Sequence, residues 1–232
     1  MIKLFLDKGH GGQDSGAIGN GLQEKALTHT IVEKIAQKLK TYTGIEVKMS
    51  RTGDQTVSLK ERTDMANAWG ADYFLSVHIN SAPDASANGF ESFIYSNTSD
   101  AKTISFQNVV HGEIMKQIAG VKDRGKKRAN LHVCRESKMP ALLTENLFII
   151  NKSDALKLKD DEFLDRIAEG HVIGLEKFLG LKKSQQPPEA QPTPPKGKLY
   201  KVQLGAFASL ENAQELARQV EKAGFKVFID EQ

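Results

Sequence analysis

The sequence predicts an α/β fold with a largely parallel or mixed sheet. Along roughly the first 180 residues, short apolar segments alternate with longer segments whose apolar residues recur at helical spacing. Such alternation is typical of a sheet flanked by helices. After residue 183 the composition changes abruptly, which separates a much smaller region from this domain.

The first half of the large region gives the clearest elements. Residues 2–7 are a short apolar run that ends at a glycine-rich turn, as a buried strand would. From residue 24 to residue 42 an apolar side chain recurs at every fourth position, which predicts an amphipathic helix ended by Gly44. We also expect strands at 45–50 and 73–79 and a helix at 59–69.

The second half continues the alternation. Residues 89–95 mix apolar and polar side chains, which predicts a half-exposed strand near a sheet edge. The basic residues at 122–128 are expected to form a solvated turn, with contact to an anionic polymer as the alternative. Helices are expected at 99–119 and 161–179, and short strands at 131–134 and 141–148.

A proline-rich segment divides the chain. Five of the seven prolines lie between Pro187 and Pro195, in a stretch without an apolar run. Such a composition favours an extended spacer over a packed core. We predict a domain over residues 1–182, a linker over 183–197 and a short βαβ fragment over 198–232, with strands at 199–204 and 225–229 around a helix at 210–223.

Composition argues against several classes of protein. The formal charge is +3, and no nucleic-acid-binding motif accompanies it, so we do not expect nucleic acid as a partner. Cys134 is the single cysteine, which excludes an intrachain disulfide and a thiolate metal cluster. The first apolar run is too short for a signal peptide, and no stretch approaches the roughly 20 apolar residues of a membrane helix. We expect a soluble monomer, made in the cytoplasm and released by other means if it acts outside.

Three side chains with metal-binding chemistry lie where the predicted sheet would bring them together. His10 follows the first strand, Glu24 begins the first helix, and His78 lies at the end of the strand at 73–79. If these strands are parallel, the three side chains reach the crevice where open α/β sheets bind ligands. Two histidines and one glutamate, with a fourth position open, are the ligand set of a hydrolytic zinc site.

A hydrolytic zinc site also needs a carboxylate that moves protons, and Glu145 is the candidate. It lies inside the apolar segment 141–148, where a buried carboxylate needs a function or a partner. Taken singly, each residue has a simpler interpretation: a lone histidine is usually structural, Glu24 suits the first turn of a helix, and Glu145 could be half of an ion pair. Asn80 could bond to substrate or to the ligand shell, or could form a turn.

Four motifs together resemble one family. They are Leu6-Asp7-Lys8-Gly9-His10-Gly11-Gly12-Gln13-Asp14-Ser15-Gly16-Ala17, Glu24-Lys25, Ser76-Val77-His78-Ile79-Asn80-Ser81 and Pro140-Ala141-Leu142-Leu143-Thr144-Glu145. In this order, across residues 2–180, they closely resemble the zinc-dependent N-acetylmuramoyl-L-alanine amidases of the amidase-3 family. The resemblance implies a twisted, mostly parallel sheet of about six strands flanked by helices.

The resemblance also implies roles for residues. His10, Glu24 and His78 match the zinc ligands, and Glu145 matches the catalytic glutamate. The implied substrate is peptidoglycan, cleaved at the amide between the lactyl group of N-acetylmuramic acid and L-alanine of the stem peptide. Lys8 stands where the family often has proline or alanine, and Leu147 where glycine is common. These departures affect loop shape and substrate fit, not the reaction.

The tail resembles a SPOR domain, which is a peptidoglycan-binding module. The motifs are Tyr200-Lys201-Val202-Gln203-Leu204-Gly205-Ala206-Phe207-Ala208, Glu211-Asn212-Ala213 and Ala223-Gly224-Phe225. That family has a βαββαβ plan, and the chain carries only the first βαβ. We therefore expect this half neither to fold alone nor to bind glycan well.

The expected function is zinc-dependent amidase activity in cell-wall lysis. A sporulation autolysin released by mother-cell lysis and a phage endolysin released through membrane pores both fit, and the SPOR-like tail favours the first. Two alternatives stay open. One is a zinc peptidase that cuts within the stem peptide, and the other is a non-catalytic protein that binds the cell wall.

Overall fold

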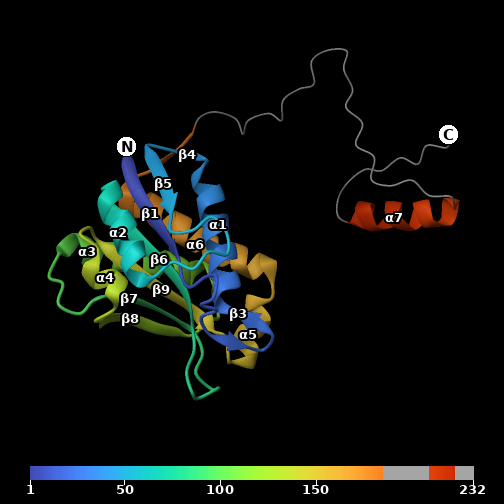
Figure 1. The fold of residues 1–232 in the computed structure, drawn as a ribbon, viewed down its shortest axis with the longest axis horizontal. Coiled ribbons are helices and arrows are strands. Elements are labelled where there is room, and N and C mark those ends of the chain that lie inside the picture. Colours follow the sequence, from blue (N-terminus) through green and yellow to red (C-terminus); the bar gives the residue numbers. More distant parts are fainter. Residues whose placement is uncertain (185–208, 223–232) are drawn as a thin grey trace, which may run out of the picture. The chain divides into compact units, whose positions relative to one another are not determined.

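A computed structural model describes residues 1–184 and 209–222 of the chain. The chain divides into two compact units, Met1–Gln186 and Pro187–Gln232, and each is described by itself. The first unit contains a six-stranded sheet with helices on both faces (Figure 1). The predicted α/β fold is therefore confirmed.

The sheet has the strand order β5-β1-β6-β9-β7-β8. Strands β5, β1, β6 and β9 run parallel, β7 pairs antiparallel with β9, and β8 pairs parallel with β7. The carboxyl ends of β1, β6 and β9 consequently meet at one edge, and the parallel pairing of β1 with β6 is the condition on which the predicted ligand crevice depended. The strands are β1 (Ile2–Lys8), β5 (Ile45–Met49), β6 (Tyr73–Asn80), β7 (Phe90–Tyr95), β8 (Asp123–Ala129) and β9 (Ala141–Phe148).

Two hydrophobic cores lie on opposite faces of the sheet. The larger core joins Leu75 and Leu142 of the sheet to Ile31, Phe106 and Ile167 of three helices. The smaller core packs sheet residues such as Phe5 and Phe74 against Ala66 and Val133. The larger core is covered by α1 (Glu24–Leu39), α3 (Ala101–Gln117), α5 (Lys152–Leu158) and α6 (Asp161–Leu179), and the smaller by α2 (Leu59–Trp69) and α4 (His132–Glu136).

Two predicted elements are wrong. Residues 122–128, expected as a turn, belong mostly to β8, which is an edge strand of the sheet. Charged side chains suit an edge strand because they oppose pairing with other chains, and Gly125, with φ 87°, interrupts the regular alternation. Residues 131–134, expected as a strand, are the N-cap and the first three residues of helix α4, because a short apolar run fits a strand and a buried helical turn equally well.

Several boundaries also differ from the prediction. Helix α1 ends at Leu39, and Gly44 lies in the turn between β4 (Tyr42–Thr43) and β5, so Gly44 does not end the helix. Strand β7 is near an edge but is not half-exposed, since Glu91 and Ser92 are buried. Glu91 is covered by Arg124 and Lys127 of β8, and Ser92 lies against His111 of α3. The hairpin of β2 (Ile18–Gly19) and β3 (Leu22–Gln23), helix α5 and the two-residue strand β10 (Lys182–Lys183) were not predicted.

In the second unit the structure describes helix α7 (Leu210–Lys222), which confirms the helix predicted at 210–223. The strands predicted at 199–204 and 225–229 lie outside the described residues. The division into domains at 1–182, 183–197 and 198–232 stays a prediction. None of the helices within residues 1–184 and 209–222 is long and apolar enough to cross a membrane.

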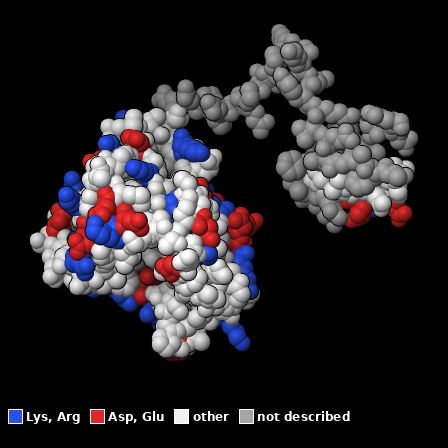
Figure 2. Space-filling model, viewed as in Figure 1, with Lys and Arg blue, Asp and Glu red and all other residues white. Residues whose placement is uncertain are grey.

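The charged side chains are mixed over the face of the first unit that Figure 2 draws. On the face drawn in Figure 2, Lys and Arg atoms are interspersed with Asp and Glu atoms. This distribution agrees with the small formal charge of +3. On this face the charges therefore do not form one broad basic surface of the kind that binds nucleic acid.

Candidate metal centre and active site

The three predicted metal ligands lie together at the carboxyl edge of the sheet. One ligand atom from each of His10, Glu24 and His78 lies within 4.8 Å of the others. The Glu24 carboxylate is central, with Oε2 3.2 Å from His10 Nε2 and Oε1 3.0 Å from His78 Nδ1. The two imidazole rings meet edge to face, with centroids 5.0 Å apart. The structure thus brings together the residues that the sequence placed on separate elements.

His10 lies in a strained turn directly after β1. Its φ is 60°, a value that residues other than glycine rarely adopt, and strain of this kind clusters at functional sites. Asp14 Oδ2 lies 2.8 Å from Nδ1 of the ring, and Arg62 Nη2 donates to the backbone oxygen at 2.8 Å. The Asp14 contact fixes the ring orientation and directs Nε2 toward Glu24.

Glu24 is the first residue of α1 and is almost fully buried. Its Oε2 accepts from the backbone nitrogen of Ala17 at 2.9 Å, and its Oε1 accepts from that of Ile79 at 3.0 Å. Burial by itself raises the pKa of this carboxyl, but the hydrogen bonds from His10 and His78 outweigh it and hold the pKa far below its usual range. Glu24 is therefore ionised and suited to a cation.

Two glycines let the backbone pass close to the ligands. A Cβ at Gly9 would lie 2.6 Å from Cε1 of His78. At Gly16, whose φ is 63°, a Cβ would lie 2.6 Å from Cδ2 of His10 and 2.7 Å from Oε2 of Glu24. Sequence reasoning gave neither glycine a role, and the only signal was the glycine-rich composition around His10.

Glu145 lies beside the three ligands. In the sheet it is the register partner of His78 on β6 and of Glu91 on β7. The residue keeps part of its surface exposed, but its Oε2 is enclosed and has no hydrogen-bond partner within the described parts of the chain. Burial, followed by the charges of Glu24 and Glu91, raises its pKa well above the usual value. This carboxyl can therefore hold a proton next to the ligands.

A buried ion pair between Asp7 and Arg62, which sequence reasoning missed, lies next to the site. Asp7 is fully buried, and its carboxylate accepts from Arg62 Nη1 at 2.5 Å and from Ser76 Oγ at 2.7 Å. Burial raises the pKa of Asp7, but the Arg62 charge and these hydrogen bonds lower it on balance. The available signal was a carboxylate at the end of an apolar strand.

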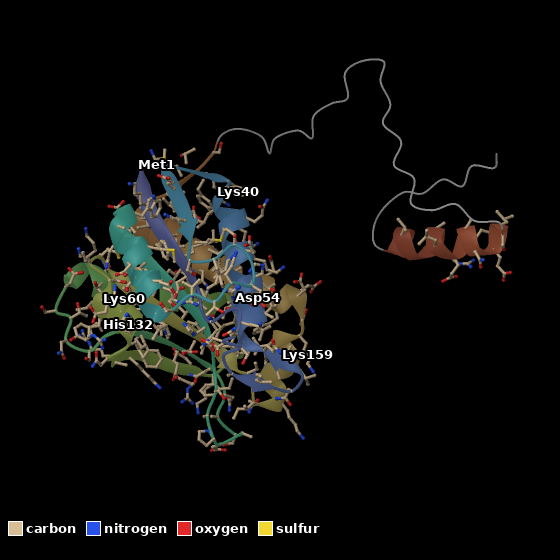
Figure 3. All side chains as sticks on the ribbon, viewed as in Figure 1. Met1, Lys40, Asp54, Lys60, His132 and Lys159 are labelled. Carbon is tan, nitrogen blue, oxygen red and sulfur yellow. The ribbon has the colours of Figure 1, made fainter. Side chains whose placement is uncertain are left out.

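Loops around the edge are tied together by further polar contacts. Asp54, labelled in Figure 3, accepts from the backbone nitrogen of Gly12 and from Lys25 Nζ, each at 2.7 Å. Asn80 donates to Glu91 Oε1 at 2.6 Å, while its own Oδ1 accepts from the backbone nitrogen of Ser81 at 2.8 Å. The Asn80 amide is thus engaged by the protein at both ends, which favours its structural interpretation.

The two departures from the family pattern have structural counterparts. The Lys8 side chain is fully buried, and its Nζ pairs with Glu33 Oε1 at 2.5 Å. Leu147 has a φ of 71°, in the region that favours glycine, although its side chain is fully buried. The backbone at position 147 thus keeps a glycine-like conformation with a leucine in place.

The chemistry of the donor set fits a zinc ion. Two imidazole nitrogens and an ionised carboxylate converge, which is the protein ligand set of many hydrolytic zinc sites. Glu145 lies on β9, next to the strand β6 that carries His78. Its Oε2 is enclosed and has no protein partner in the described residues. The arrangement has the chemistry to hold a cation, with a carboxyl group beside it that can carry a proton.

Comparison with known families and proteins agrees with this chemistry. Residues 4–177 match the family described as N-acetylmuramoyl-L-alanine amidase, and residues 196–232 match the SPOR domain. The sporulation-specific N-acetylmuramoyl-L-alanine amidase of Bacillus subtilis (strain 168) is 49% identical over 230 residues, covering 99% of this chain and 84% of that protein. The endolysin of Bacillus phage SPP1 is 45% identical over 208 residues, covering 87% of this chain and 76% of the endolysin.

Solved structures share the fold. The catalytic domain of CwlV, an N-acetylmuramoyl-L-alanine amidase from Bacillus (Paenibacillus) polymyxa var. colistinus, matches with a TM-score of 0.74 at 33% identity, over 78% of this chain and 100% of that one. An N-acetylmuramoyl-L-alanine amidase from Clostridium difficile 630 also matches with a TM-score of 0.74, at 35% identity, over 77% of this chain and 97% of that one.

Proposed function

Because the chain belongs to the N-acetylmuramoyl-L-alanine amidase family, we propose that His10, Glu24 and His78 hold a zinc ion and that Glu145 moves the proton in its reaction. The enzyme hydrolyses peptidoglycan at the amide between N-acetylmuramic acid and L-alanine. The observation that carries the residue assignment is the convergence of three ligand atoms within 4.8 Å of one another, beside Glu145.

The protein groups around the ligands prepare a cation site. A bound zinc ion would supply Lewis acidity, which acidifies water and polarises the amide carbonyl. Glu24 supplies the negative charge, and its contacts with both imidazoles hold their nitrogens toward one point. Asp14 fixes the ring of His10 from the opposite side. Such outer contacts keep ligands in orientation before the metal binds.

Glu145 carries the proton between water and the leaving group. Its carboxylate takes a proton from the water that attacks the lactyl carbonyl. The oxygen of the water stays on the lactyl carbon, the carbon–nitrogen bond breaks, and Glu145 returns the proton to the amine of L-alanine. The enclosed Oε2 supports this role, since it has no competing protein donor among the described residues.

We propose that the protein acts as a monomer in cell-wall lysis. It reaches the wall after its release from the cell that made it. The similar proteins include one named a sporulation-specific amidase and one named an endolysin. The SPOR match at residues 196–232 favours the sporulation role.

Metal analysis combined with end-group analysis tests the proposal. The wild-type chain should retain zinc and should free amino-terminal L-alanine from purified walls while the glycan stays intact. His78→Ala should lose the zinc, whereas His132→Ala, in helix α4 (labelled in Figure 3), should keep it. New termini within the stem peptide would support a peptidase instead. Lysis unaffected by EDTA would overturn the zinc mechanism.

A further inference from the structure

A second charged cluster lies one strand beyond Glu145. It consists of Glu91 on β7 and of Arg124 and Lys127 on β8. Glu91 is the register partner of Glu145, and its side chain is only 6% exposed. Its Oε2 accepts from Arg124 Nε at 2.8 Å and from Lys127 Nζ. The proposed reaction uses none of these three residues.

The cluster carries an excess of positive charge. Burial raises the pKa of Glu91, but the hydrogen bonds and charges of Lys127 and Arg124 lower it on balance, so the carboxylate is ionised. One negative charge therefore faces two positive charges. The side chains of Arg124 and Lys127 remain 25% and 38% exposed, so both cations also face solvent.

The guanidinium of Arg124 is held in a fixed orientation. Its Cζ lies 4.7 Å from the ring centroid of Phe148, and Nη1 lies 3.5 Å from the backbone oxygen of Asn88. Glu91 occupies only Nε, and a guanidinium has further N–H donors that match a carboxylate. A donor group that is already ordered loses little entropy when it binds a ligand.

A side chain of the residue after L-alanine can extend from the reacting bond toward β8. Neighbouring strands lie about 4.8 Å apart, so Glu91 is one spacing and β8 two spacings from Glu145. An extended peptide spans about 3.5 Å per residue. A carboxylate on the residue after L-alanine therefore lies roughly 7 Å from the cleaved amide, within reach of the side chains that β8 extends toward Glu91.

We propose that Arg124 and Lys127 form an anion subsite for a carboxylate of the stem peptide, carried by the residue that follows L-alanine. Glu91 is the positioning residue that holds both cations beside the site. This inference rests on the proposed amidase function and adds a substrate preference to it. An enzyme with this subsite distinguishes stem peptides with a free carboxylate from those in which that group is a carboxamide.

Steady-state kinetics on two matched substrates test the subsite. Both are soluble, uncross-linked glycan strands with stem tripeptides, and they differ only in whether the residue after L-alanine carries a carboxylate or a carboxamide. For the zinc-loaded full chain, Arg124→Gln and Lys127→Gln should each raise KM for the carboxylate substrate by about 10- to 100-fold, as expected for a lost charge-assisted hydrogen bond. KM for the carboxamide substrate and kcat for both should change by less than about twofold.

Lys126→Gln is the matched control on the same strand. Lys126 Nζ contacts Asn108 Oδ1 at 2.7 Å, on α3 and away from Glu91, so this variant should behave as wild type. Glu91→Gln should raise KM for the carboxylate substrate while KM for the carboxamide substrate stays unchanged. The Glu91 charge also contributes to the raised pKa of Glu145, so this variant is judged by the two KM values and not by kcat. A rise in KM on one substrate alone separates a positioning role from general damage to the fold.

Two outcomes would overturn the subsite. In one, the wild type cleaves both substrates with equal KM. In the other, the variants raise KM by the same factor on both, as they would if these cations bound an anionic polymer of the wall instead. Failure of the wild type to cleave either substrate would overturn the proposed function, which is a distinct result.

Discussion

Arg62 Nη2 donates to the backbone oxygen of His10 at 2.8 Å, so helix α2 directly holds the turn that carries a proposed zinc ligand. The same guanidinium pairs through Nη1 with the fully buried Asp7 at 2.5 Å. The Arg62 side chain thus neutralises the buried charge of Asp7 and also holds the backbone of His10, whose φ is strained.

Replacing Arg62 with methionine should destabilise the protein strongly. The change leaves the Asp7 carboxylate buried without its partner, and breaking a buried pair in this way costs about 3–5 kcal/mol. Urea unfolding measures the loss. Arg62→Lys keeps a positive charge near Asp7 and should lose less. A loss below about 1 kcal/mol for Arg62→Met would contradict the role assigned to the pair.

Gly9→Ala should remove the metal without removing a ligand. The new Cβ would lie 2.6 Å from Cε1 of the His78 ring, so the ring must leave the position in which its Nδ1 lies 3.0 Å from Glu24 Oε1. Zinc content after dialysis should fall, while circular dichroism still reports a folded protein. Gly112→Ala is the control, since a Cβ at this helical position meets nothing within 4 Å. Retention of zinc by Gly9→Ala would mean that the ring tolerates the displacement.

Leu147→Gly should be more stable than Leu147→Ala, the reverse of the usual order. Both variants lose a fully buried side chain, which costs about 2–5 kcal/mol. Alanine keeps the strain of φ 71°, worth about 1–2 kcal/mol, and glycine relieves it. Thermal or urea unfolding compares the pair. Leu143, on the same strand, is the control: there the alanine variant should be more stable than the glycine variant. If Leu147→Ala is also more stable than Leu147→Gly, the backbone at position 147 is not strained.

His171 should make stability fall at mildly acidic pH. Burial lowers its pKa from 6.5 to about 4, although the bond to the Ile167 oxygen raises it. Between these two pKa values the unfolded chain binds a proton at His171 that the folded chain excludes. The neutral His171 therefore contributes fully to the free energy of unfolding above pH 6.5, and this contribution is lost as the pH falls toward 4. The shift corresponds to about 3 kcal/mol.

Urea unfolding at several pH values, compared with His171→Gln, isolates this effect from that of the carboxylates. The variant cannot be protonated at this position, so its stability should fall less between pH 6.5 and 4 than that of the wild type. Parallel curves for the two proteins would show that His171 accepts its proton without unfolding the core.

The sequence was sufficient to predict most of the sheet and the four proposed site residues. His10, Glu24 and His78 each lie in or beside an element with a strong apolar pattern, which brings them to one sheet edge once the strands are parallel. Glu145 was singled out as a carboxylate within an apolar segment, and the resemblance to the amidase-3 family assigned the roles of all four residues. Helix α6 was predicted with its observed bounds, because its apolar stripe is continuous and Gly180 follows it. Local pattern and tertiary structure agree in these elements.

The remainder depends on contacts between distant segments. The close approach of Gly9 to the His78 ring is set by how β1 packs beside β6 and has no local signature. Arg124 and Lys127 belong to β8, whose alternation is interrupted by Gly125, so their segment resembled a turn. Their pairing with Glu91 arises only when β8 joins the sheet edge.

The initial rate of muramoyl–L-alanine cleavage by zinc-loaded Glu145→Gln, measured with zinc content matched to wild type, tests the central claim most directly. Glutamine nearly preserves the shape of the side chain but cannot carry the proton. The account predicts unchanged zinc binding and a rate about 10²- to 10⁴-fold lower. Cleavage at the wild-type rate with zinc bound would show that Glu145 is not the proton carrier.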